Sequence, residues 1–427
     1  MTYTFLQHYW CFVVALLAAL LVFLMFVQGA NTLIFSLGRT PDERRLIVNA
    51  TGRKWEFTFT TLVTFGGAFF ASYPLFYSTS FGGAYWLWMI ILFSFVLQAV
   101  SYEFQRAPIP TFSEGKEKKE NTPPRGRWRG AIFQYLLVLN GILGPLLLGG
   151  AVATFFTGSN FIVEKDNIIN SQFSMDNSQC SMLNAQCSMV NDQCSMLNAQ
   201  CSMIISRWAN ASHGLDALLN PWNIVLGLAI VFLARILGCL YIHKQVEDSQ
   251  LDGHNRILRP LWTSTILFLG LFLAFLGHIL TCEGYAVDPA TGVVFMEPFK
   301  YLHNLLDMWP LLIVLLIGVV FVLFGILWSL THKEYKRGFW VVGFGTVVTV
   351  TVLLLLTAWN NTAYYPSTAD LQSSLTMQNS CSSEFTLRTM FYVSLLIPFV
   401  LAYIIYAWQA IDKKELTMDE INNDHAY

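Results

Sequence analysis

The sequence predicts an all-α polytopic membrane protein with nine transmembrane helices. Apolar residues make up 55% of the 427 residues and charged residues only 12%, whereas soluble proteins are close to a quarter charged. The apolar residues gather in long runs that lack the period-two alternation of a membrane β-barrel. Helices then satisfy the backbone within a bilayer. The net charge of −2 gives no indication of nucleic-acid binding.

Nine apolar segments are long enough to cross a bilayer as helices, which takes about 20 residues. Their expected limits are Tyr9–Ile34, Phe57–Phe76, Gly82–Tyr102, Gly130–Phe156, Trp222–Ile242, Trp262–Cys282, Trp309–Leu330, Phe339–Trp359 and Met390–Trp408. Many segment ends carry a tryptophan, as is typical at the headgroup depth of a membrane. These residues are Trp55, Trp128, Trp222, Trp262, Trp309, Trp340, Trp359 and Trp408.

The basic residues predict the orientation of these segments. Of the 25 Lys and Arg residues, 20 lie in the odd-numbered loops and the C-terminal tail, 4 lie in the even-numbered loops, and Arg235 lies within a segment. Short loops rich in Lys and Arg stay on the cytoplasmic side. We therefore expect the N-terminus outside and the C-terminus in the cytoplasm.

The first loop is densely charged and runs directly into the second segment. It reads LGRTPDERRLIVNATGRKWEF and continues TFTTLVTFGGAFFASYPLFYSTSFGGAYW. Trp55 and Glu56 lie at the junction. A carboxylate entering a bilayer is costly, so Glu56 is a candidate for proton transfer. The alternative is an interfacial Glu56 that pairs with Arg53 or Lys54.

Glu103 ends the third segment, in SYEFQ. It is a second candidate for a proton path, but a helix-end anchor is favoured because segment ends tolerate charge at little cost.

The fifth and sixth segments contain two polar residues, Arg235 and His278. Either residue faces a partner subunit, a lipid headgroup or an internal carboxylate. For His278 we favour an interhelical hydrogen bond. For Arg235 the choice stays open, because its long side chain can also reach the cytoplasmic interface.

The loop after the fourth segment contains a seven-residue repeat over residues 172–203. The units read QFSMDNS, QCSMLNA, QCSMVND, QCSMLNA and QCSM. Its thiols and thioethers suit Cu(I), and its period suits a coiled coil. We favour a third interpretation, a tandem duplication tolerated in a loop, because the copies are nearly identical.

The chain resembles subunit II of the cytochrome bd quinol oxidases. The resemblance rests on the LGR…ERR loop, on Asn49 followed by Trp55-Glu56, and on GGA-x-F-A-x-x-P-x-x-Y from Gly66 to Tyr77. Near the C-terminus it rests on Pro366-Ser367, on SSLTMQNS and on FTLRTMFYVSLLIPFVLAYIIYAW. Together these motifs bracket most of the chain.

The resemblance implies two four-helix bundles, formed by the first four and the last four helices, with the fifth helix peripheral. In this sequence the division is 1–158 with a cytoplasmic linker at 103–128, an extracytoplasmic loop at 159–221, the peripheral helix at 222–243, the second bundle at 244–410 and a cytoplasmic tail at 411–427. The resemblance also implies that the protein lies in the bacterial cytoplasmic (inner) membrane.

The implied function is that of the non-haem subunit of a terminal oxidase, which oxidises membrane quinol and reduces dioxygen to water. Subunit I, the implied partner, holds two haems b and one haem d. This chain itself is expected to bind no metal, although a structural quinone and membrane lipids are implied as contacts. In the family, an aspartate at the position of Glu56 is implicated in a proton path, in which we include Trp55.

The chain departs from the family in its first helix. The family carries the acidic motif D-G-F-D-x-G, where this chain has Gln28, Gly29 and Asn31, and no acid precedes Asp42. Gln98 lies near the position of a family arginine. We expect Gln28 and Asn31 to make intramembrane polar contacts, while the role of the missing acids is either absent or supplied elsewhere.

Two other functions remain open from the sequence. A secondary transporter would need a midplane site formed by broken helices in repeated positions, and Arg235 is the one weak candidate for it. The second alternative is a purely structural scaffold subunit. It differs from the oxidase subunit described above only in whether Glu56 carries protons.

Overall fold

The computed structural model describes residues 2–104, 126–167, 202–246, 254–332 and 335–411. Its α-helices are α1 Tyr3–Leu24, α2 Phe26–Asn31, α3 Ile34–Leu37, α4 Pro41–Gly52, α5 Trp55–Ser72, α6 Pro74–Phe76, α7 Tyr85–Phe104, α8 Gly126–Thr157, α12 Pro221–Gln245, α13 His254–Thr281, α14 Lys300–Asp307, α15 Trp309–Thr331, α16 Gly338–Ala358, α17 Met377–Ser380, α18 Glu384–Ser394 and α19 Ile397–Ile411. A π-helix covers Tyr77–Gly83, and short 3₁₀ helices cover Leu215–Leu218 and Leu371–Ser373. The strands are β1 Phe161–Asn167, β2 Ser202–Trp208, β3 Glu283–Val287 and β4 Val294–Pro298.

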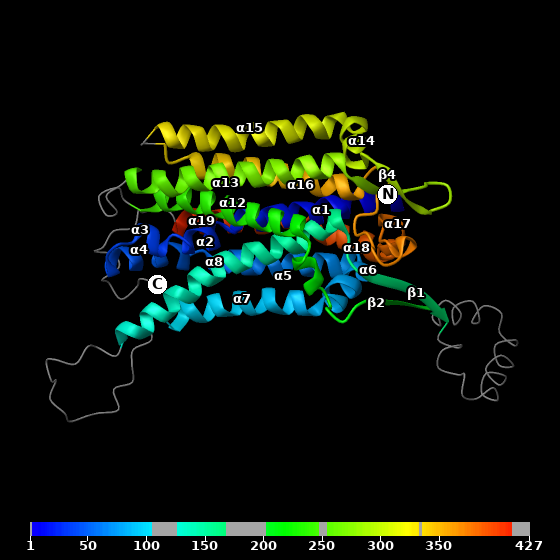
Figure 1. The fold of residues 1–427 in the computed structure, drawn as a ribbon, viewed down its shortest axis with the longest axis horizontal. Coiled ribbons are helices and arrows are strands. Elements are labelled where there is room, and N and C mark those ends of the chain that lie inside the picture. The colour runs from blue at the N-terminus through cyan, green and yellow to red at the C-terminus, as the bar shows by residue number, and fades with distance from the viewer. Residues whose placement is uncertain (1, 105–125, 168–201, 247–253, 333–334, 412–427) are drawn as a thin grey trace, which may run out of the picture.

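The long helices run alongside one another. The two β-hairpins and α17 lie at one end, which we call the hairpin end, and α3 and α4 lie at the other, the α4 end (Figure 1). In the described residues, seven helices are long and apolar enough to cross a membrane, or up to nine if each of two bent pairs is one span. The prediction of a mostly helical chain with many apolar spans is therefore confirmed.

The two bent pairs lie where the sequence predicts the second and ninth spans. After α5 the chain turns by 118°, so α5 ends at Ser72 and not at the predicted Phe76. Pro74 explains this turn, because a proline pushes the residue before it out of the helical region, and Tyr73 has φ −132° and ψ 67°. The α18 and α19 pair bends by 43°, and Pro398 lies at this break.

Helix α12, which the family resemblance predicts to be peripheral, packs closely against other helices of this chain. Within its most apolar window 72% of the residues are buried, the largest share among the seven spans. It packs against α2, α8 and α13. The physical reason is backbone contact through glycine: a Cβ on Gly238 would lie 2.7 Å from the carbonyl carbon of Gly29, and one on Gly149 would lie 2.7 Å from the Cα of Gly227.

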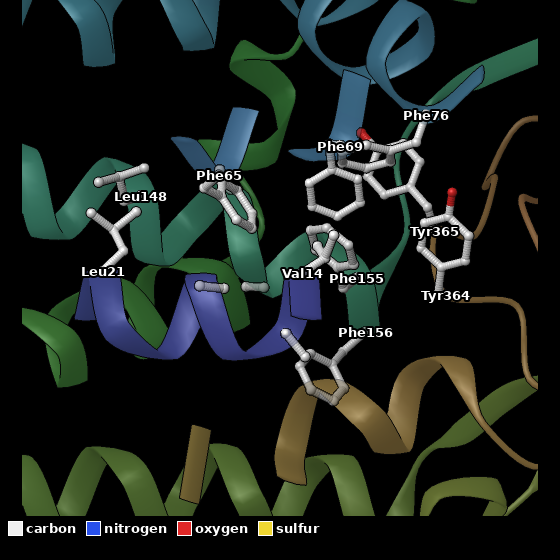
Figure 2. Packing of buried hydrophobic residues seen from close by; sticks show 14 of the residues in the cluster. Val14, Leu21, Phe65, Phe69, Phe76, Leu148, Phe155, Phe156, Tyr364 and Tyr365 are labelled. Atoms are coloured by element: carbon white, nitrogen blue, oxygen red, sulfur yellow. The ribbon is translucent and has the colours of Figure 1, made fainter. Parts of the chain in front are cut away.

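The buried core divides into two main clusters. One gathers at the α4 end, around Phe26, Tyr241 and Phe339. The other lies toward the hairpin end, where α5 and α6 place Phe69 and Phe76 against Phe155 of α8 (Figure 2). Contacts between aromatic rings stabilise helix packing beyond the area that they bury. Helices α1, α5 and α8 therefore form a fixed frame for the residues near them.

The hairpin end contains two small antiparallel sheets, β1–β2 and β3–β4, which the all-α prediction did not include. In the first sheet Asn167 pairs with Ser202. The repeat at 172–203 lies outside the described residues except for its last two, which begin β2.

Deleting residues 172–203 is expected to leave assembly and oxygen uptake unchanged. The physical reason is that β1 and the rest of β2 keep most of their paired residues, and shortening a loop costs little free energy. Yield of the assembled complex and oxygen uptake per complex measure the result. A large loss of either would instead support a selected role for the repeat, such as copper binding.

Helix α4 begins with a capping box that the sequence TPDE provides. Thr40 accepts a hydrogen bond from the backbone N–H of Glu43, and Glu43 accepts one from the backbone N–H of Thr40. Glu43 also accepts a hydrogen bond of 2.8 Å from Arg256 of α13. Burial acts to raise the pKa of Glu43, but its hydrogen bonds and the Arg256 charge outweigh burial and lower the pKa below 4.5.

The Glu43–Arg256 contact is expected to weaken in acid. Because the folded pKa lies below the unfolded value, the stabilisation is complete above about 4.5 and is lost as the pH falls through the folded pKa. Thermal unfolding of the purified complex at decreasing pH measures this loss. Glu43→Gln should lower stability at neutral pH and make the loss below pH 4.5 shallower; equal slopes would contradict the assignment.

Candidate functional site

Trp55 and Glu56 form the first turn of α5, at the α4 end. The Glu56 side chain is exposed on the outer surface of the helix bundle. Trp55 is half-buried, and its ring stacks on Tyr102 of α7 with centroids 6.1 Å apart. The junction thus places a carboxylate at the surface beside an aromatic contact that joins α5 to α7.

Lys54 does not pair with Glu56. Its ammonium group lies 4.1 Å from the ring centroid of Trp408 and 5.7 Å from that of Phe57, and the side chain is 1% exposed. Within the described residues Glu56 makes no ion pair, so the pairing with Arg53 or Lys54 considered from the sequence is not found. This leaves the Glu56 carboxylate available at the surface.

Glu103 is also exposed, at the end of α7. It follows Tyr102, which is buried and stacks on Trp55. The two candidate carboxylates, Glu56 and Glu103, therefore lie at the same end of neighbouring helices.

Gln28 and Asn31 belong to a buried polar seam between α2, α7 and α8. Gln28 donates a hydrogen bond of 2.9 Å to Gln98. Asn31 accepts one of 2.7 Å from the Tyr102 hydroxyl. Asn140 of α8 donates to the carbonyl and hydroxyl oxygens of Ser94, both at 2.9 Å. The sequence predicted polar contacts for Gln28 and Asn31 but did not identify Tyr102, Ser94 or Asn140 as partners.

The spacing of polar residues along α7 could have indicated from the sequence that this helix takes part in the seam. Ser94, Gln98 and Tyr102 are four residues apart, so they share one face of the helix. Polar residues repeated on one face of an otherwise apolar span indicate a contact with another polar helix. A search for such stripes would have found α7 without the structure.

Arg235 and His278 make different kinds of contact. Arg235 donates a hydrogen bond of 3.1 Å to the Thr32 hydroxyl. The His278 ring stacks on Trp222, with centroids 3.9 Å apart and an interplanar angle of 5°. The interhelical hydrogen bond favoured for His278 is not found: within the described helices its ring makes no hydrogen bond and stacks on Trp222 instead.

No group of three or more His, Cys, Asp or Glu residues within the described residues is placed to hold a metal ion. One cavity among them has a volume of about 90 Å³ and lies between α1, α8, α12, α13, α15 and α16. A cavity that binds benzene measures about 150 Å³, and a quinone ring with its oxygens is larger than benzene. A structural quinone therefore does not fit this cavity.

Sequence comparison matches nearly the whole chain to one family of membrane proteins. A sequence model of the family described as cytochrome bd terminal oxidase subunit II matches residues 6–411. Subunit 2 of the cytochrome bd-I ubiquinol oxidase of Escherichia coli K12 is 23% identical, over 98% of this chain and 97% of the relative. A probable cytochrome oxidase subunit 2 of Haemophilus influenzae is 24% identical, over 95% and 94%.

A solved structure shares the fold. The bd oxidase of Geobacillus thermodenitrificans matches with a TM-score of 0.59 and 10% sequence identity, over 99% of both chains. The apolar helices and these relatives identify a multi-pass protein of the inner membrane. Because the family match runs through almost its entire length, this chain belongs to the cytochrome bd terminal oxidase subunit II family.

Proposed function

We propose that this chain is the non-haem subunit of a cytochrome bd-type quinol oxidase, a complex that oxidises membrane quinol and reduces dioxygen to water. The observation that carries the proposal is the family match over residues 6–411. A subunit II implies a subunit I, and we assign the two haems b, the haem d and the quinol chemistry to that partner. Haem supplies electron transfer and oxygen chemistry, so the residues of this chain act by support and by proton delivery.

In this proposal Glu56 delivers protons. A carboxylate exposed on a membrane helix is costly against lipid, so Glu56 faces water or the partner subunit. The outward face of α5 also carries the exposed residues Thr60, Thr64 and Gly67, and small and hydroxyl residues of this kind favour helix–helix contact. We therefore place the partner subunit against this face, with Glu56 at its cytoplasmic edge.

The proposed topology has nine spans, with the α4 end in the cytoplasm. The basic residues of the first loop, Arg39 to Lys54, support this side, and the N-terminus then lies outside. The two halves, 1–158 and 244–410, contact each other directly through α1 and α16. Both also contact α12, which packs against α2 and α8 of the first half and α13 of the second. Membrane lipids cover the exposed apolar face of α15, which includes Ile317 and Val320.

A reduced-minus-oxidised visible spectrum of the complex that co-purifies with this chain in mild detergent tests the assignment. Bands of haem b and haem d on a larger partner, together with quinol-dependent oxygen uptake, are expected. A colourless preparation without a partner would overturn the proposal and favour the alternative of a transporter with Arg235 in its site.

A further inference from the structure

The polar seam between α2, α7 and α8 is fully enclosed. Gln28, Asn31 and Gln98 are 0% exposed and Asn140 is 2% exposed. All four side chains are amides, which are uncharged near neutral pH. The seam is therefore an uncharged polar site inside an otherwise apolar bundle.

In the part of the chain that the structure describes, each of these four amides has one atom without a hydrogen-bond partner. Within the described residues, the side-chain oxygens of Gln28 and Asn140 accept no hydrogen bond, and the side-chain nitrogens of Gln98 and Asn31 donate none. A buried polar group without a partner is destabilising, because it has lost its hydrogen bonds to water without replacing them. Four such atoms in one seam indicate a polar ligand that supplies their hydrogen bonds.

The free atoms define the chemistry of that ligand. Two of them are donors and two are acceptors, so the ligand must both accept and donate. A metal ion is excluded by the two N–H groups. A water molecule meets the requirement, because it makes about three hydrogen bonds of both kinds at a buried site.

Gly144 of α8 leaves room between the amides. A Cβ placed on Gly144 would lie 3.6 Å from the Asn140 amide nitrogen, 3.7 Å from Cγ of Gln28 and 3.8 Å from the Phe95 ring. These are ordinary contact distances, so a methyl group would fit into this space. Gly144 therefore lies beside Gln28 and Asn140, the two amides whose side-chain oxygens are free.

We propose that this seam binds internal water, at least two molecules, each of which links a free N–H of Asn31 or Gln98 to a free oxygen of Gln28 or Asn140. The space beside Gly144 is one of the two positions. The inference does not depend on the proton path through Glu56, because the unsatisfied atoms need partners whether or not protons move.

Radiolytic hydroxyl labelling of the intact oxidase complex in H₂¹⁸O tests the proposal. Tyr102 and Phe95 are 3% and 1% exposed, so bulk water does not reach them, and their labelling requires bound water beside the ring. We expect both rings to be labelled in the wild-type complex, while Phe26, 0% exposed in an apolar cluster, stays unlabelled.

The matched variants are Gly144→Ala and Gly150→Ala, both on α8. A methyl group on Gly150 meets Leu218 at 3.4 Å, away from the amides. Gly144→Ala should lower the labelling of Phe95 several-fold, and Gly150→Ala should leave it unchanged. Equal labelling in the two variants would overturn the assignment of water to the space at Gly144.

Electron cryomicroscopy of the wild-type complex, at a resolution that shows ordered water, gives a second test that needs no variant. Density for water between the amides would support the proposal even if Gly144→Ala fails to assemble. Amide groups that have rotated to bond directly to one another, with no density between them, would overturn it.

Discussion

Replacing Glu56 by glutamine is expected to lower quinol-dependent oxygen uptake by at least about tenfold while the complex still assembles. A positioned group that transfers protons contributes about 10²–10⁴-fold to a rate, and an amide keeps the shape of the carboxylate without its proton chemistry. Assembly should survive because the side chain is exposed and makes no ion pair within the described residues. Oxygen uptake, normalised to the haem content of the complex, measures the effect.

Two variants separate proton transfer from a merely structural effect. Glu56→Asp retains a carboxylate and should keep most of the activity. Asp42→Asn removes an exposed carboxylate that lies near Arg45, and it should leave the rate unchanged. Wild-type turnover in Glu56→Gln would sink the proton-path hypothesis and leave this chain as a scaffold for its partner.

Glu103 provides a further comparison at the same end of the bundle. If it is a helix-end anchor, as segment ends allow, Glu103→Gln should leave oxygen uptake within experimental error of the wild type. A loss comparable to that of Glu56→Gln would place both carboxylates on the path.

The sequence predicts the spans well because hydropathy is a local property. The limits expected for the seventh and eighth segments differ by at most one residue at either end from α15 and α16. The turn after Ser72 was also encoded locally, in Pro74, but an apolar run alone does not reveal it. Even strand pairs at a loop, such as β3–β4, are short enough to be missed in a chain dominated by apolar helices.

The candidate site was predictable only in part. The Trp55–Glu56 junction stands out because a charged loop meets an apolar span there. The partners of Gln28 and Asn31 do not, because Gln98 and Tyr102 are 70 and 71 residues farther along the chain. Contacts over such distances depend on how helices pack, and packing is not contained in the composition of a single helix.

A large loss of stability is expected from Gly238→Ala in α12. A Cβ at this position would lie 2.7 Å from the carbonyl carbon of Gly29 and 2.8 Å from Cα of Ala30. Both neighbours are backbone atoms of α2, which no side-chain rotation can move. Overpacking of a tight core costs about 1–3 kcal/mol, occasionally more, and a contact between two backbones should lie at the upper limit.

The matched control is Gly270→Ala on α13, where a Cβ would meet nothing within 4 Å. Alanine is favoured over glycine in a helix by roughly 0.5–1 kcal/mol, so the control should be neutral or slightly stabilising. Thermal unfolding and yield of the assembled complex measure both variants. A sharp loss for Gly238→Ala alone means that α12 depends on its backbone contact with α2 in the assembled protein. If Gly238→Ala behaves like the control, α2 and α12 do not touch in the assembled protein, as expected for a peripheral α12.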